Sequence, residues 1–121
     1  MWSNPKREIW RSERYLSLVR QLQVCVNCGH LGNCQAAHIG TLTDGKGGAL
    51  KTPDSMVASL CSLQPNPVNE SWKEGCHEAW DQRKGQFKGL TWDEYQYLGF
   101  MFVAKTQIML LEGGLLKVSA S

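Results

Sequence analysis

The residues able to do chemistry gather in the middle of the chain. Cys25 and Cys28 form a C-x2-C motif, whose short turn can direct two thiolates at one tetrahedral zinc ion. A second pair is needed to complete such a site, and Cys61 and Cys76 are the available candidates despite their wide spacing. Cys34 is left over, either as a small buried hydrophobe or as a replacement for one of those four.

His77 follows Cys76 directly, and Asp81 lies four residues further on. On a helix these two positions share a face, so both side chains would point at the same place. An imidazole and a carboxylate suit a divalent cation that keeps open positions for water and substrate. His38 lies in a different setting, between Ala37 and Ile39, where a histidine is more often a core residue than a catalyst.

These side chains need elements that hold them. The stretches "CQAAHIG" and "SMVASLC" indicate two strands, and the glycine-rich "GTLTDGKGGALKTPD" between them indicates a loop. Pro65 and Pro67 predict that the segment after the second strand has no regular structure. A helix is expected from Gly75 to about Lys84, which gives the order strand, loop, strand, loop, helix.

Two longer helices are expected on either side of this region. Ser12 can cap the first, which we place at 12–24 and whose apolar positions are Tyr15, Leu18, Val19 and Leu22. The segment "TWDE" at 91–94 is a capping box, and the helix it begins should end near Gly113 and Gly114, at about residue 112. We expect its apolar stripe to face the core: Tyr95, Leu98, Phe102, Ile108 and Met109.

Composition limits the class of protein. With 121 residues, of which 42% are hydrophobic, the chain suits one folded domain spanning 1–121. No apolar run is long enough for a membrane span, and the polar first ten residues do not resemble a secretory signal. Five cysteines without an export signal favour a reducing compartment, so we expect a cytoplasmic protein that does not bind membranes.

The combination and order of motifs resembles a known family. C-x2-C, "AHI", a glycine-rich loop, "KTPD", "SLC" and "CHEAWD" are similar to the HNH, or ββα-metal, endonucleases. The resemblance is greatest to small phage and prophage HNH-like nucleases, including the Ref-type recombination-associated group, and it covers roughly residues 12–90. It implies an α+β fold, with a zinc-stabilised ββα-metal core at 25–88 between the two longer helices.

The resemblance also implies roles for individual residues. His38 would be the general base, His77 and Asp81 would hold a catalytic Mg²⁺ or Mn²⁺, and Asp54 would orient the base or approach that metal. The structural Zn²⁺ would be held by Cys25, Cys28, Cys61 and Cys76. Basic residues that can contact DNA phosphates are Lys46, Lys51, Arg83, Lys84 and Lys88. The position before the base, which is a metal ligand in many members, is Ala37 here.

The expected activity is therefore metal-dependent hydrolysis of DNA phosphodiester bonds with low sequence specificity, in phage or prophage recombination or DNA processing. DNA is the expected partner, together with recombination proteins, and a phage-encoded chain would act in the host-cell cytoplasm. One alternative is a non-catalytic zinc module that binds DNA or a protein. Another is a redox protein using Cys25 and Cys28, which the absence of a recognisable βαβ pattern disfavours.

Overall fold

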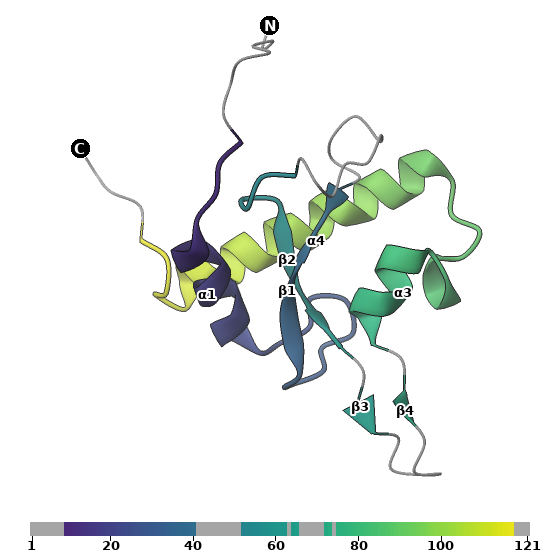
Figure 1. Ribbon diagram of the computed structural model, residues 1–121, viewed down its shortest axis with the longest axis horizontal. Helices are drawn as coiled ribbons and strands as arrows, with labels where there is room; N and C mark the ends of the chain where they lie inside the picture. Colours follow the sequence, from purple (N-terminus) through teal and green to yellow (C-terminus); the bar gives the residue numbers. More distant parts are fainter. Residues whose placement is uncertain (1–8, 41–51, 63, 66–71, 74, 118–121) are drawn as a thin grey trace, which may run out of the picture.

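The computed structural model describes residues 9–40, 52–62, 64–65, 72–73 and 75–117. The chain has an α+β fold whose elements follow in the order α1 (Glu13–Leu22), β1 (Cys34–His38), β2 (Val57–Cys61), β3 (Gln64–Pro65), β4 (Trp72–Lys73), α3 (Cys76–Gln82), the 3-10 helix η2 (Gly85–Phe87) and α4 (Trp92–Glu112). Helices α1 and α3 lie on either side of the β1–β2 hairpin, and α4 crosses behind it (Figure 1).

Strands β1 and β2 form an antiparallel sheet in which Cys34 pairs with Cys61 and His38 pairs with Val57. All five residues of β2 are buried, whereas β1 exposes Gln35 and half-exposes His38. The hairpin therefore forms the centre of the core through β2. It presents polar side chains to the surface only from β1.

Helix α1 begins where the sequence indicates. The Ser12 hydroxyl accepts a hydrogen bond from the Tyr15 N–H at 3.1 Å, and Tyr15 and Val19 bury the inner face. The helix ends at Leu22, two residues before the expected boundary, because Gln23 adopts a left-handed conformation (φ 49°). The Gln23 side-chain amide donates to the Arg20 and Cys34 carbonyls, which ties the end of α1 to the start of β1.

Helix α3 is held by a cluster of aromatic rings. Trp80 is almost completely buried and stacks on Tyr95 of α4 at 4.0 Å between ring centroids. The edges of the Phe87 and Phe102 rings also meet the Trp80 ring. The Tyr95 hydroxyl donates to the Trp80 carbonyl at 2.6 Å, so the buried phenol is satisfied. This cluster fixes which face of the short α3 turns toward solvent.

Helix α4 begins with the capping box indicated by "TWDE", formed by Thr91 and Glu94. The expected inward stripe is partly wrong: Tyr95 and Phe102 are buried, but Ile108 is 51% exposed. The inner face is completed by residues outside the expected stripe: Gly99, Val103, Thr106 and Leu110. No helix in the described part of the chain is both long and apolar enough to cross a membrane.

The segment after β2 departs from the expectation of an irregular loop. Gln64 pairs with Lys73 and Pro65 pairs with Trp72, so β3 and β4 form a second, two-residue antiparallel ladder. Proline removes one N–H donor, which a very short strand at a sheet edge tolerates. The prediction of no regular structure at Pro65 is wrong, because proline excludes mainly central strands.

Candidate functional site

Four cysteine side chains meet at one end of the hairpin. The sulfur atoms of Cys25, Cys28, Cys61 and Cys76 all lie within 4.8 Å of one another. The Cys28 and Cys61 sulfurs are 3.8 Å apart, the separation expected when a tetrahedral zinc ion holds each sulfur at about 2.3 Å. The cluster could therefore hold a metal such as zinc. Cys34 lies outside it, with its sulfur 3.4 Å from the Gly32 carbonyl.

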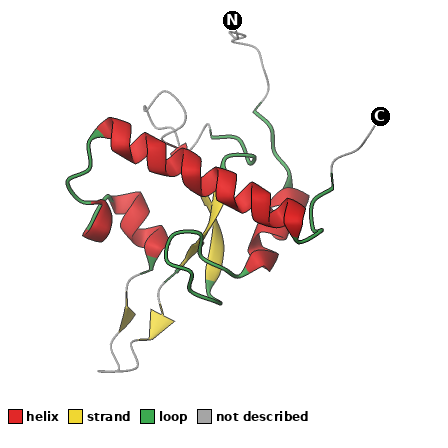
Figure 2. Ribbon diagram, turned by 180° about the vertical axis from the view of Figure 1, so that it is seen from behind, coloured by secondary structure: helices red, strands yellow, loops and turns green. Residues whose placement is uncertain are grey.

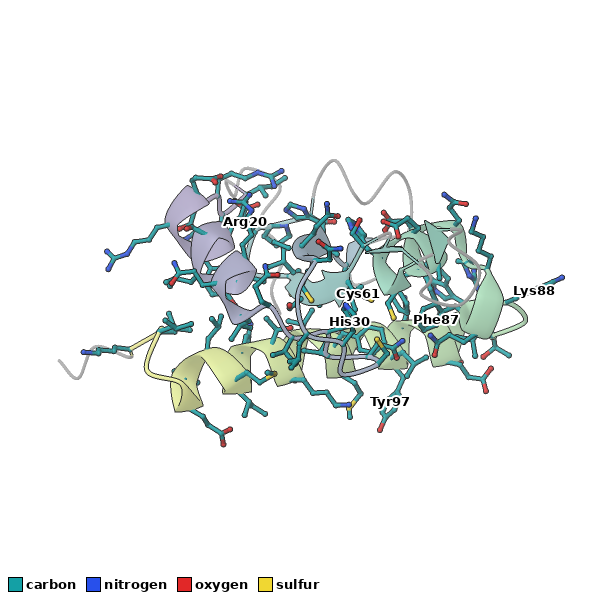
Figure 3. The ribbon with its side chains drawn as sticks, turned by 90° about the horizontal axis from the view of Figure 1, so that it is seen from below. Arg20, His30, Cys61, Phe87, Lys88 and Tyr97 are labelled. Carbon is teal, nitrogen blue, oxygen red and sulfur yellow. The ribbon has the colours of Figure 1, made fainter. Side chains whose placement is uncertain are left out.

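The C-x2-C motif is docked onto β2 by the backbone. The Val26 N–H donates to the Ser59 carbonyl at 2.9 Å, and the Ser59 hydroxyl donates to the Val24 carbonyl at 2.8 Å. The turn is closed by a hydrogen bond from the Gly29 N–H to the Cys25 carbonyl, and Gly29 takes a positive φ of 79°. These contacts set the first two thiols beside Cys61, which Figure 3 shows in the interior of the molecule.

Cys76 reaches the cluster through a close approach of α3 to the end of β2. Gly75 precedes the helix, and a Cβ at this position would overlap the backbone of Cys61 and Ser62. The Glu78 carboxylate accepts hydrogen bonds from the Gly75 N–H and the Ser62 hydroxyl, both at 3.0 Å. The absence of a side chain at Gly75 therefore lets the fourth thiol join the other three.

Three thiols of the cluster differ in acidity. The Cys76 thiol donates to Cys25 and, with backbone N–H groups, lowers the pKa of Cys25 to about 4. Burial raises the pKa of Cys61 to about 11, and the bond to Cys25, with burial, also raises the pKa of Cys76. Of these three groups Cys25 ionises first. A bound dication would favour deprotonation of Cys61 and Cys76 as well.

His38 and Asp54 form a hydrogen-bonded couple at the far end of β1. His38 Nε2 lies 2.9 Å from Asp54 Oδ1, and Asp54 is buried with 4% exposure. The same carboxylate accepts the Ser12 N–H at 2.7 Å and the Arg11 guanidinium at 3.1 Å. The residues just before α1 therefore fix the Asp54 carboxylate, and this carboxylate in turn orients the His38 ring.

The protonation of this couple follows from these contacts. Burial by itself raises the pKa of Asp54, but the hydrogen bonds from His38, Ser12 and Arg11 outweigh burial and hold that pKa below its usual range. An ionised carboxylate is an acceptor only, so His38 donates through Nε2–H. In the neutral ring the lone pair is then on Nδ1, the tautomer a general base needs.

His77 and Asp81 form a second couple on α3. His77 Nε2 lies 3.2 Å from Asp81 Oδ2, and His77 Nδ1 lies 2.6 Å from Gln35 Oε1 on β1. The Asp81 hydrogen bond raises the pKa of His77 against the opposing effect of burial. The Asp81 side chain is 54% exposed, so water screens this interaction. The side chains of Cys76 and Trp80 point inward from the same helix.

The donor set at this couple suits a hydrated divalent cation only in part. Donation of Nδ1–H to Gln35 would leave the Nε2 lone pair facing Asp81, as in metal-bound histidines with a fixed second nitrogen. Among the described residues no third histidine, cysteine or carboxylate joins His77 and Asp81. Ala37 is in the core with 1% exposure and offers no ligand. Water and substrate would have to fill the remaining positions.

Three of the basic residues expected at phosphates, Arg83, Lys84 and Lys88, lie in the described part of the chain, at the end of α3 and just after it. The Arg83 guanidinium lies over the Tyr95 ring at 4.4 Å and donates to the Leu90 carbonyl at 2.9 Å, which joins α3 to α4. Lys88 projects from the end of the molecule (Figure 3), and Lys84 is half-buried. Lys46 and Lys51 lie outside the described residues.

Sequence reasoning missed several residues that hold these groups. Nothing in the sequence indicates that Gln35 contacts His77, beyond its place in a predicted strand. Nothing indicates that Arg11 contacts Asp54, beyond its charge. Ser12 was recognised only as a helix cap, yet its backbone N–H also binds Asp54. Gly75 was recognised only as a helix start. A carboxylate near a predicted N-terminus, as Glu78 is, could have been recognised as a cap.

Comparisons with protein-family models, with curated proteins and with solved structures give no match to this chain.

Proposed function

We propose that this protein is an HNH-like, metal-dependent endonuclease that hydrolyses DNA phosphodiester bonds with low sequence specificity in phage or prophage DNA processing. The observation that carries the proposal is a pair of polar couples: His38 of β1 with Asp54 from the turn before β2, and His77 with Asp81 on α3. The four-cysteine cluster supports it, because it links the hairpin to the helix and so holds the two couples in a fixed relation.

In the proposed reaction His38 Nδ1 takes a proton from the water that attacks phosphorus, and Asp54 stabilises the resulting imidazolium. The new P–O bond forms as the bond to the 3′ oxygen breaks, and the 3′ oxygen takes a proton from solvent. His77 and Asp81 would hold Mg²⁺ or Mn²⁺, which supplies positive charge for the phosphate and the leaving oxygen. Lys84 and Lys88 can contact neighbouring phosphates, which positions the strand without reading its sequence.

A second candidate is a non-catalytic zinc module that binds DNA or a protein. Gln35 and His38 are three positions apart on β1, so strand alternation directs their side chains to opposite faces. Gln35 contacts His77, whereas His38 contacts Asp54. Cleavage requires both couples to reach one phosphate around the strand, so their placement on opposite faces of β1, with the buried Ala37, is the observation that favours binding without cleavage.

A cleavage assay separates the two candidates. Purified protein is incubated with plasmid and with single-stranded circles, first with Mg²⁺ or Mn²⁺ and then with a chelator. The nuclease proposal predicts metal-dependent nicking that the chelator stops, and a loss of about 10²- to 10⁴-fold in His38→Ala. His30→Ala is the matched control, because His30 contributes only backbone contacts at the C-x2-C turn.

Metal-independent cutting, or equal cutting by His38→Ala, contradicts the assignment of His38 as the base. Absence of cleavage together with salt-sensitive DNA binding would favour the zinc module.

A further inference from the structure

The outer face of α4 is apolar along most of its length. Its large side chains there are substantially exposed: Tyr97 64%, Phe100 57%, Met101 37%, Ile108 51% and Leu111 43%. With Ala104 they recur at intervals of three and four positions, which places them on one side of the helix. We call these six residues the outer stripe of α4.

The outer stripe lies opposite the face that packs on the protein's own core. Tyr95 and Phe102 pack on Trp80 of α3. Thr106 and Leu110 lie against β2, whereas Tyr97 points away from the rest of the molecule (Figure 3). Seen from behind, no described element covers α4 (Figure 2). A helix that is apolar on both sides is normally buried on both sides. The stripe is therefore a surface that lacks its partner.

The size of the surface fits a protein interface. The six side chains of the stripe leave on the order of 500 Å² of apolar area exposed to solvent. This area is near the upper end of the range for the largest apolar patch on a monomeric protein. With a polar rim, such a patch approaches the roughly 800 Å² that each partner buries in a standard interface. Charged side chains of both signs flank the stripe, Asp93, Glu94 and Glu112 together with Lys105, so it carries no excess of positive charge that would attract a nucleic acid.

We propose that a second copy of this chain covers the outer stripe, with the two α4 helices packed antiparallel about a two-fold axis near Ala104. Exposed Ala104 lies in the middle of the stripe, where a small side chain allows two helices to approach closely. A two-fold axis at this point brings Tyr97 of one copy beside Leu111 of the other, and Phe100 beside Ile108, so the stripe is complementary to itself.

The helix dipoles favour the antiparallel direction, because the positive N-terminal end of each α4 then lies beside the negative C-terminal end of the other. This inference does not depend on the proposed nuclease activity.

Sedimentation equilibrium of the full chain tests the proposal. At about 100 µM, well above a micromolar dissociation constant, the wild-type protein should have twice the 13.6 kDa mass of one chain. Ile108→Glu and, independently, Phe100→Glu should raise the dissociation constant about 100-fold or more, because each buries a charge in the stripe. Zinc content and circular dichroism establish that each variant folds. Leu31→Glu is the matched control, since Leu31 is 74% exposed at the C-x2-C turn and should not affect the mass.

The position of the axis is tested at Ala104. Ala104→Glu should weaken the dimer at least as much as Ile108→Glu or Phe100→Glu, because two negative charges would then meet at the two-fold axis. A wild-type chain that is monomeric at 100 µM overturns the proposal. So does a dimer that survives Ile108→Glu and Phe100→Glu, and a dimer that survives Ala104→Glu overturns the position of the axis.

Discussion

The cysteine cluster and the two histidine couples are built in opposite ways. In the cluster, three of the four cysteines are buried. The four thiols come from the C-x2-C turn, β2 and α3, so a metal bound by them would link these three parts of the fold. In the couples, both histidine side chains are partly exposed, and Asp81 is exposed whereas Asp54 is buried. The first arrangement is that of a site that stabilises a fold. The second leaves His38, His77 and Asp81 within reach of solvent.

The difference teaches what each region can tolerate. A buried metal site depends on each of its four thiolates. Removing one weakens metal binding, and without the metal the remaining thiolates repel one another. The exposed His77–Asp81 couple can lose a member without loss of the fold, since water replaces the missing contact. The His38–Asp54 couple is intermediate, because its carboxylate is buried and its loss should also cost some stability.

The largest effect is expected from the cluster. Cys25→Ser or Cys61→Ser should abolish zinc binding and leave the protein poorly folded, because structural zinc contributes on the order of 10 kcal/mol to small domains. Metal analysis of protein purified without added zinc should find about one equivalent in the wild type. Cys34→Ser is the control and should keep both zinc and fold. Loss of zinc in Cys34→Ser but not in Cys61→Ser would contradict the ligand set.

The next effect concerns the approach of α3 to β2. Gly75→Ala should destabilise the protein by about 2–4 kcal/mol, because the new Cβ overlaps backbone that cannot move without displacing Cys61. Gly89→Ala is the control: it has open space, so it should cost only the roughly 1 kcal/mol of its positive φ. Urea unfolding of both variants measures the difference. Equal destabilisation would show that the close approach is unimportant.

A smaller effect should appear in acid at the His38–Asp54 couple. The pKa of Asp54 is lowered by folding, so its contribution to stability is complete above its unfolded pKa near 3.8 and is lost as pH falls through the lower folded value. Asp54→Asn should therefore be less stable than wild type by about 1.5–3 kcal/mol at neutral pH, and the gap should narrow below about pH 4.

Thermal unfolding of wild type and Asp54→Asn at several pH values measures that gap. Any acid release of zinc affects both proteins, so their difference isolates Asp54. A gap that stays constant down to pH 3 would mean that Asp54 is not held ionised by His38, Ser12 and Arg11.

The smallest effect is expected at the exposed couple. If His77 and Asp81 hold the catalytic metal, Asp81→Asn should raise the Mn²⁺ concentration for half-maximal cleavage about tenfold, with zinc content and stability unchanged. His77→Ala should have an equal or larger effect. Gln82→Ala, at an exposed position on the same helix, should have none. Titration of Mn²⁺ by electron paramagnetic resonance checks binding without relying on cleavage.

Much of the fold could be predicted from local patterns. The caps at Ser12 and Thr91, the two strands around the glycine-rich loop and the helix after Gly75 each follow from the preferences of a few adjacent residues. The four cysteines were also identifiable, because a C-x2-C motif requires a second pair and only three other cysteines exist. The i, i+4 spacing of His77 and Asp81 likewise required only the helix.

Tertiary structure decided the rest, because these contacts join residues far apart in sequence whose meeting depends on how elements pack. Asp54 meets His38 across 16 positions and Gln35 meets His77 across 42, and no local preference encodes either contact. Helical periodicity identified α4 but not which of its two apolar faces turns inward, since both satisfy the same pattern. Packing on β2 buried Thr106 and left Ile108 exposed. The sequence by itself determined the elements and the chemistry available on them, and only the packed structure determined which of those groups meet.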